Sequence, residues 1–467
     1  MTSSIKQVIK RTGAVVPFTP ERITNAIYRA AVAVGGRDRS IAENLTQQVI
    51  DILATIPPDG IPQRSPSSCS ECSEVGVDRD PTVEEIQDVV EQVLIHNGHA
   101  KVAKAYILYR EERARLRREK AARGYREASN IPWRKIYEVL RWSVDHDLHT
   151  VERLNARIAH GGFPHIVQAG DRCYEEDIDT AVQLIVQRRH HLKLVIIAGP
   201  SSSGKTTTTI KLGQRLAKAG LSLMTLNVDN YFFDLEQHPK DEFGDYDFET
   251  PQALDLRLIN QHLVHLIAGE EVRLPRYDFK TGKRLDGVTP MRIGSNDIIL
   301  IDSLHGLYPP MTEDVEDGLK FLLYIEPLLQ MKGPDGRMIR WTDLRLMRRI
   351  VRDATHRAYE PQKTLEHWHY VRSSEMRNIL PYAHSTDYII NSAVSYELPV
   401  MRRRLLESFA RWAQNYRQDP LRADACERAK RVYQLLQSVA PIEEKDEEAI
   451  PPTSHLREFI GGSSYQY

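Results

Sequence analysis

The sequence predicts an α/β protein in which helices flank a parallel sheet, and three observations support this fold class. Residues 194–198 form a continuous apolar run, which is typical of a strand buried on both faces. A glycine-rich loop at 199–204 follows this run directly, and an apolar pattern of helical period begins at Ile210. A second apolar run, 298–301, ends at Asp302, as a further strand of the same sheet would.

The chain is long enough for several domains. Its 467 residues correspond to about two to four domains at roughly 100–200 residues each. From changes in the residue pattern we expect a mostly helical module at 1–121 with an insertion at 57–81, a helical connector of unknown role at 122–190, an α/β domain at 191–400 and a helical tail at 401–467.

Composition and charge narrow the class of partner and the compartment. Lys and Arg together number 63 and Asp and Glu number 64, a balance that gives no electrostatic reason to expect nucleic acid or membrane as a partner. Apolar runs stay short of the ~20 residues of a membrane span. We therefore expect a cytoplasmic protein, and four cysteines agree with a reducing compartment. Cys69 and Cys72 lack a second ligand pair for zinc, so we interpret them as two thiols in a polar loop.

The N-terminal module shows clear helix signals. The run 14–18 predicts a short strand whose proline favours an edge position. A helix is expected from Pro20, with Ile23, Ile27 and Ala30 on one face. Another begins after Thr82, where Glu85 completes a capping box. Its apolar stripe consists of Ile86, Val89, Val90, Val93 and Leu94. A third helix is expected at 100–120, and the connector is interrupted at Gly161 and Gly162.

The loop after the first strand has the pattern G-x-x-x-x-G-K-T at 199–206, which we call the P-loop. Glycines at its two ends let successive N–H groups point into one concavity, and the following helix adds positive potential at its N-terminus. Lys205 would reach the β- and γ-phosphates, and Thr206 would ligate Mg²⁺. The residues expected around ATP are Gly199, Pro200, Ser201, Ser202, Ser203, Gly204, Lys205, Thr206 and Thr207. This pattern is common to kinases, ATPases and GTPases.

Two acids follow predicted strands of the sheet. The run 223–228 ends at Asp229, and ligands of open α/β sheets lie beyond the carboxyl ends of the strands. Asp229 could accept a proton from a substrate hydroxyl, or it could only cap a helix. Asp302 could hold Mg²⁺ directly or through water, or it could be a strand-end turn residue.

A helix beyond the second strand carries four arginines at positions i, i+3, i+4 and i+7: Arg345, Arg348, Arg349 and Arg352. On one helix face these charges repel one another unless an anion lies against them. We interpret them, with Arg357 beyond, as a lid over transferring phosphate. The alternatives are a solvated face, an RNA-binding helix, which the neutral net charge opposes, or partial neutralisation by Asp343 and Asp353.

Together these patterns resemble the uridine kinase and phosphoribulokinase family of P-loop kinases. The motifs that carry the resemblance are 199–206, 229–232, 246–251, 275–284, 298–302, the arginine helix and 387–391. The similarity extends through 456–463 to a bacterial branch of uridine kinase-like nucleoside kinases. The resemblance implies a P-loop NTPase fold, ATP and Mg²⁺ as cofactors, and transfer of the ATP γ-phosphate to a hydroxyl of a nucleoside.

Residue roles follow from this resemblance. It implies that Asp229 is the base toward a ribose 5′-hydroxyl, that Glu249 holds the ribose hydroxyls, and that Tyr277 and Phe279 wall the nucleobase. The implied acceptor site consists of Asp229, Tyr231, Glu249, Tyr277, Phe279 and Arg284. The implied catalytic set consists of Asp229, Lys205, Arg345, Arg348 and Arg352, with Arg357 on ATP and with Thr206 and Asp302 on the metal.

The chain departs from the family pattern in two places, and each keeps another function open. Gly282 stands where uridine–cytidine kinases have a histidine that reads the pyrimidine, so the acceptor could be a sugar phosphate or a small phosphorylated hydroxy acid. Its phosphate would then bind a basic cluster of Arg276, Lys280, Lys283 and Arg284. Asp302 replaces the usual Glu, which is the sole support for a non-catalytic, ATP-responsive regulatory protein.

The N-terminal module resembles an ATP cone, the allosteric nucleotide module of ribonucleotide reductases. The matching segments are 8–13, 17–23, 81–91 and 102–110. The resemblance implies that ATP or dATP binds the module and tunes the enzyme, with Lys10, Arg11 and Lys104 on the phosphates. It also suggests a homo-oligomer.

Overall fold

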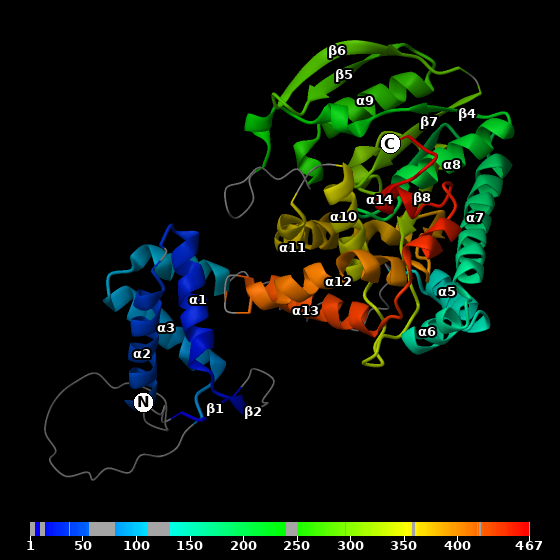
Figure 1. The fold of residues 1–467 in the computed structure, drawn as a ribbon. Coiled ribbons are helices and arrows are strands. Elements are labelled where there is room, and N and C mark those ends of the chain that lie inside the picture. The colour runs from blue at the N-terminus through cyan, green and yellow to red at the C-terminus, as the bar shows by residue number, and fades with distance from the viewer. Residues whose placement is uncertain are drawn as a thin grey trace, which may run out of the picture. The chain divides into compact units, whose positions relative to one another are not determined.

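The computed structural model divides into two compact units, Met1–Glu127 and Ala128–Tyr467, and each has hydrophobic core clusters of its own. Figure 1 colours the chain from its N-terminus to its C-terminus. The residues that the structure describes are 5–9, 15–36, 38–55, 80–110, 131–239, 250–294, 296–356, 360–417, 419 and 422–466. Cys69 and Cys72 lie outside these ranges.

The first unit is a small helical module with a two-stranded antiparallel ribbon. Its elements are β1 (Gln7–Ile9), β2 (Val15–Pro17), α1 (Pro20–Ala33), α2 (Arg39–Thr55), α3 (Val83–His96) and a helical stretch at 100–110. The predicted capping box is confirmed, because the Thr82 hydroxyl accepts from the Glu85 N–H and the Glu85 carboxylate accepts from the Thr82 N–H. Helix α2 was not predicted from the sequence.

A five-stranded parallel sheet forms the centre of the second unit, which confirms the predicted fold class. Its strands are β3 (Leu194–Ala198), β4 (Ser222–Thr225), β7 (Asp297–Ser303), β8 (Lys320–Glu326) and β9 (Tyr388–Asn391). The spatial order is β4-β7-β3-β8-β9, so the strand that precedes the P-loop is the middle one. Every residue of β3 is buried, as the continuous apolar run predicted.

Helices and a hairpin cover the two faces of this sheet. Helices α7 (Phe163–Gln187) and α8 (Lys205–Lys218) pack on one face. On the other face lie α9 (Leu256–Ile267) and the antiparallel hairpin of β5 (Val272–Asp278) and β6 (Lys283–Met291). Figure 1 shows the hairpin lying over α9. The P-loop thus begins from a strand that neighbours hold on both sides.

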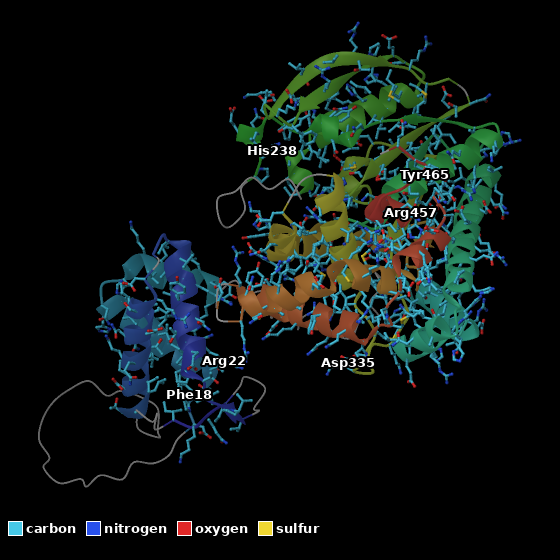
Figure 2. All side chains as sticks on the ribbon, viewed as in Figure 1. Phe18, Arg22, His238, Asp335, Arg457 and Tyr465 are labelled. Carbon is cyan, nitrogen blue, oxygen red and sulfur yellow. The ribbon has the colours of Figure 1, made fainter. Side chains whose placement is uncertain are left out.

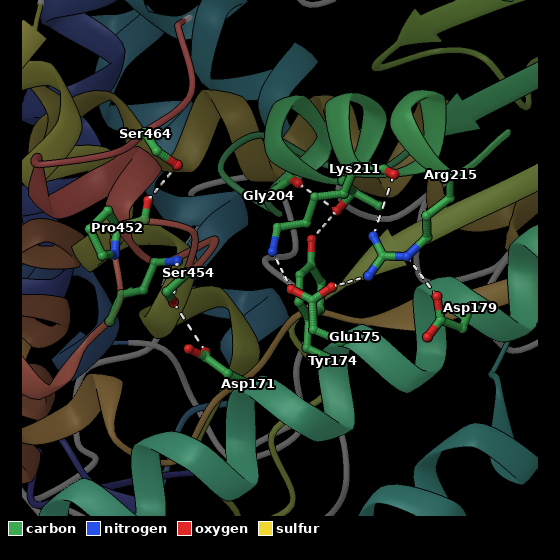
Figure 3. A network of polar contacts seen from close by, with 12 residues as sticks. Asp171, Tyr174, Glu175, Asp179, Gly204, Lys211, Arg215, Pro452, Ser454 and Ser464 are labelled. Carbon is green, nitrogen blue, oxygen red and sulfur yellow. Dashed lines mark hydrogen bonds and ion pairs between the residues drawn. The ribbon is translucent and has the colours of Figure 1, made fainter. Parts of the chain in front are cut away.

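Helix α7 is held to the P-loop helix α8 by polar contacts as well as by apolar packing. Figure 3 shows Glu175 pairing with Lys211 and Arg215, while Asp179 pairs with Arg215 at 2.6 Å. The Tyr174 hydroxyl shares a hydrogen bond of 2.6 Å with the Thr208 hydroxyl. The segment whose role could not be predicted therefore covers the sheet and fixes the helix that follows the P-loop.

The remaining helices build a second core beside the sheet. They are α5 (Trp133–Asp145), α6 (Val151–Ala159), α10 (Trp341–His356), α11 (Pro361–Asn378), α12 (Glu397–Asn415), α13 (Ala423–Ser438) and the short α14 (Arg457–Ile460). Helix α6 ends where predicted, since Gly161 has a positive φ of 70°. The expected boundary between 400 and 401 falls inside α12. Within the described ranges, no helix is long and apolar enough to cross a membrane.

Candidate active site

The P-loop depends on its two glycines for different reasons. Gly199 leaves β3 so close to β8 that an added Cβ would lie 2.4 Å from the Ile325 carbonyl oxygen. Gly204 precedes α8 with a φ of 94°, a left-handed conformation that disfavours residues with a side chain. Ser202 is also left-handed, with a φ of 60°. The loop is therefore a strained and closely packed turn, as expected where backbone N–H groups converge.

Side chains of the loop suit an anionic ligand. Lys205 reaches back across the loop and donates from Nζ to the Gly199 carbonyl at 3.0 Å. The hydroxyls of Ser202 and Ser203 are buried, and in the described part of the chain they have no hydrogen-bond partner. Thr206 is exposed. Buried hydroxyls without partners are costly unless a ligand satisfies them, so these residues fit the phosphates of a nucleotide.

Two carboxylates lie close to Lys205. Burial raises the pKa of both above the ordinary value, and the charge of Lys205 offsets part of that rise. Asp302 pairs in register with Ile197 of β3 and accepts from the Thr209 hydroxyl at 3.3 Å. Burial raises the pKa of Asp302 above its ordinary value. Asp229 lies in the 3₁₀ turn η1 (Val228–Tyr231), where its backbone N–H donates to the Asn227 side chain at 3.0 Å. The structure therefore brings together Lys205, Asp229 and Asp302.

Asp229 is accessible to solvent, yet the protein around it is dense enough to change its titration. Burial is the largest cause that raises its pKa, and the nearby Asp302 carboxylate adds to the rise. Mg²⁺ usually takes one or two carboxylates, waters and substrate phosphates in such sites. Thr206 and Asp302 fit that pattern, and the described residues contain no cluster of three or more acidic, His or Cys side chains that would indicate a different metal site.

The interpretation of Arg345 and Arg348 as lid residues over the phosphate is wrong. Both side chains are almost completely buried. Arg345 pairs with Glu326 at 3.1 Å and with Glu375, while Arg348 pairs with Glu397 at 2.7 Å. Buried carboxylates of the protein itself therefore supply the negative charge that these helix arginines require.

The same helix nevertheless touches the P-loop. Arg345 donates to the Ser201 carbonyl and Arg349 donates to the Ser201 hydroxyl, each at 3.1 Å. Arg349 and Arg352 are partly exposed and share Asp353 as an ion-pair partner. Arg349 is absent from the predicted catalytic set, although the helical spacing places it on the same face. Arg345 supports the loop, and Arg349 and Arg352 are the arginines of this stripe that a ligand could reach.

An aromatic cluster lies beside η1, where the Tyr277 N–H donates to the Asn230 side chain at 3.3 Å. The Tyr277 ring lies 5.0 Å from Phe279 and 5.5 Å from Phe232, edge-on or tilted. His238, labelled in Figure 2, stacks on Tyr277 at 6.2 Å between ring centres. Phe279 is exposed, whereas the buried Tyr277 hydroxyl has no hydrogen-bond partner among the described residues. Such a wall can hold a flat ring, and no sequence signal identified His238.

Two other predicted acceptor residues have different positions from those expected. Tyr231 is fully buried and its hydroxyl bonds Nδ1 of His262 at 2.8 Å, so the expectation that it contacts the acceptor is wrong. Arg284 is held by Asp255 at 3.1 Å and by Asp286 at 2.8 Å. Asp255 immediately precedes α9 and Asp286 lies on β6, so carboxylates from two elements already balance the charge of Arg284.

The departure at Gly282 has a structural reason. Its φ is 67°, and an added Cβ would lie 2.8 Å from the Cβ of Leu235. The Gly282 carbonyl also accepts from the Leu235 N–H at 2.8 Å. The hairpin turn packs so closely on the segment after η1 that a histidine cannot replace this glycine without displacing Leu235.

Several predicted residues lie outside the described ranges: Glu249, Arg357, Lys10 and Arg11. Lys104 is described and is exposed on the helical stretch 100–110. Their assigned roles stay predictions.

Comparison with known proteins gives a consistent result. Residues 194–398 match the model of the phosphoribulokinase / uridine kinase family, and residues 6–64 and 70–115 match that of the ATP cone domain. A uridine kinase of Deinococcus deserti is 26% identical over 195 residues, which are 42% of this chain and 84% of that protein.

A reductase and a solved structure also resemble parts of this chain. A vitamin B12-dependent ribonucleoside-diphosphate reductase of Thermoplasma acidophilum is 38% identical over 129 residues, which are 26% of this chain and 14% of the reductase. A solved structure from Bacillus stearothermophilus, described as a possible uridine kinase, is 17% identical with a TM-score of 0.29 and covers 46% of this chain and 98% of its own.

Proposed function

Since residues 194–398 belong to the phosphoribulokinase / uridine kinase family and an ATP cone precedes them, we propose that the protein is an ATP-dependent kinase that phosphorylates a nucleoside hydroxyl. The observation that carries this proposal is the convergence of Lys205, Asp229 and Asp302 beside the P-loop. It supplies a cation for the phosphates, a base for the acceptor and a carboxylate for a metal at one edge of the sheet.

The proposed mechanism assigns one task to each group. The P-loop N–H groups and Lys205 hold the nucleotide phosphates and stabilise the charge that develops during transfer. Asp229 accepts the proton of the acceptor hydroxyl and orients its oxygen. Arg349 and Arg352 are placed to neutralise the transferring group. Thr206 and Asp302 would hold Mg²⁺, and the ion would supply positive charge that stabilises the phosphate oxygens during transfer.

Two cations of the hairpin already pair with carboxylates of the protein, which favours an acceptor without a phosphate. Lys283 pairs with Glu236 at 2.9 Å and with Asp234 at 3.4 Å. Arg284 is engaged by two carboxylates of its own, as described above. Two of the four cations that a sugar phosphate would need are thus neutralised, while the aromatic wall suits a nucleobase.

The acceptor class can be tested with a panel of nucleosides, sugar phosphates and small phosphorylated hydroxy acids, each incubated with γ-labelled ATP and Mg²⁺. We expect label transfer to at least one nucleoside and none to the phosphorylated acceptors. Transfer to a sugar phosphate alone would overturn the nucleoside assignment. ATP binding without transfer to any acceptor would instead favour a regulatory protein.

The raised pKa of Asp229 predicts the shape of the pH profile. A general base works only when deprotonated, so kcat/KM should fall on the acid side with an apparent pKa above the value of about 3.9 of a free Asp. Asp229→Asn should remove this acid-side fall from the residual activity at saturating Mg²⁺ and ATP. If the fall of kcat/KM at acid pH persists unchanged, another group titrates there. Coupled carboxylates share their apparent pKa values, so the variant is needed to assign the group.

The N-terminal module is proposed to regulate the kinase by binding ATP or dATP. We expect the full chain to show activation or inhibition as either nucleotide is titrated at fixed acceptor, and residues 128–467 to lose that response. Separate hydrophobic cores in the two units make this truncation feasible. Identical kinetics of the two forms would reject regulation by the cone, because allostery requires a measurable coupling between two sites.

A further inference from the structure

The C-terminal segment 454–460 lies against the start of the P-loop helix α8. Glu458 is buried, and one carboxylate oxygen accepts both from the Thr207 N–H at 3.1 Å and from the Thr207 hydroxyl at 2.8 Å. Thr207 is the third residue of α8, so its N–H is one of the first four of the helix, which lack partners within the helix itself. An anion from the end of the chain therefore occupies a donor pair at the phosphate-binding end of α8.

A second residue of the segment packs directly on the P-loop. His455 is completely buried, and its Nε2 hydrogen-bonds the Ser392 carbonyl at 2.8 Å. Its ring lies 4.1 Å from the Tyr174 ring, and its Cδ2 would lie 3.8 Å from a Cβ added to Gly204. Burial and the charge of Arg348 hold the pKa of His455 well below its ordinary value. Two side chains of the segment thus lie close to the P-loop and its helix, His455 near Gly204 and Glu458 on Thr207.

The backbone of the segment is anchored independently of Glu458. Leu456, Phe459 and Ile460 belong to the second core. Arg457 donates to the carbonyls of Glu447 and Ile450 at 2.8 and 2.6 Å. Figure 2 labels Arg457 and Tyr465 in this terminal part of the chain. The Glu458 side chain can therefore leave Thr207 while the segment stays folded.

We propose that Glu458 is an autoinhibitory phosphate mimic, which a nucleotide must displace from Thr207 in order to bind the P-loop. The inference rests on the proposed function, because it assumes that a nucleotide is the ligand of the loop. P-loop N–H groups hold the α- and β-phosphates, and a carboxylate and a phosphate oxygen cannot share the same two donors. Their like charges also oppose simultaneous occupancy.

The test is the equilibrium affinity of the full chain for Mg²⁺-ATP, measured by calorimetry for the wild type, Glu458→Gln and Glu458→Ala. Loss of a charge-assisted competitor should tighten ATP binding by about 10-fold or more. Glu447→Gln is the matched control. Glu447 is another buried carboxylate of the C-terminal region, but it pairs with Arg403 and Arg404, so its replacement should leave ATP affinity unchanged.

A measurement on the unaltered chain guards against variants that fail to fold. Carbodiimide labelling of the Glu458 carboxylate, read by mass spectrometry of the peptide 454–460, should rise when ATP is added, because the side chain is released from Thr207. Unchanged or weaker ATP binding in both Glu458 variants, with no change in labelling, would overturn the proposal and leave Glu458 as a structural cap of α8. Absence of ATP binding in every form, wild type included, would instead refute the proposed kinase function.

Discussion

Replacing Asp229 with Asn is expected to lower kcat by about 10²–10⁴-fold, the usual contribution of a general base, with little change in ATP affinity. The carboxylate is accessible to solvent and lies near Lys205 and Asp302. An amide of the same size keeps the turn η1 intact, because the Asp229 N–H and not its side chain bonds Asn227. The loss should therefore fall on the chemical step.

Steady-state kinetics with the best acceptor, together with calorimetry of ATP binding, separates the two effects. Glu236→Gln is the matched control, since it removes an exposed carboxylate on the segment that follows η1. Its kcat should stay near that of the wild type. A kcat of Asp229→Asn within a few-fold of the wild type would remove Asp229 from the proton transfer and leave it as a structural residue of the turn.

Replacing Arg348 with Met is expected to destabilise the second unit by about 3–5 kcal/mol, the cost of leaving one buried ion unpaired. Arg348 and Glu397 are completely buried and joined by two hydrogen bonds, of 2.7 and 3.0 Å. Arg348 also donates to the Ser392 carbonyl at 2.7 Å, and the Ser392 hydroxyl bonds the Ser203 carbonyl of the P-loop. Loss of the pair should therefore loosen the loop as well.

Urea denaturation followed by circular dichroism measures this effect. The double variant Arg348→Met with Glu397→Met should recover most of the stability, because no buried charge is left without a partner. Arg134→Ala breaks the exposed pair with Glu138 and should cost about 0–1 kcal/mol. A fully stable Arg348→Met protein that has lost only catalysis would restore the catalytic role that the burial of Arg348 argues against.

Local patterns predicted the centre of the site well. The order of apolar strand, glycine-rich loop and amphipathic helix occupies adjacent positions in the chain, so the P-loop and its lysine could be located from the sequence. Asp302 was also placed correctly beside the loop, because the carboxyl ends of parallel strands meet at one edge of the sheet. These features need no knowledge of distant contacts.

The arginine helix shows why other features could not be predicted. Helical spacing places Arg345 and Arg348 on one face, but it does not say what lies against that face. Their carboxylate partners Glu375 and Glu397 are 30 and 49 positions away, and only the fold brings them together. The same reason hid Glu458, which is 251 positions from Thr207.

Helix α7 has a consequence for how the catalytic part can be isolated. The family match begins at residue 194, yet Tyr174, Ile178 and Ile185 of α7 pack on the sheet together with Leu212 of α8. A fragment that begins at residue 194 would lose α7. The apolar face of the sheet that α7 buries would then be exposed to solvent, and the fragment would be prone to aggregate. The smallest soluble form of the catalytic part should therefore start before α7, well upstream of residue 194, where the family match begins.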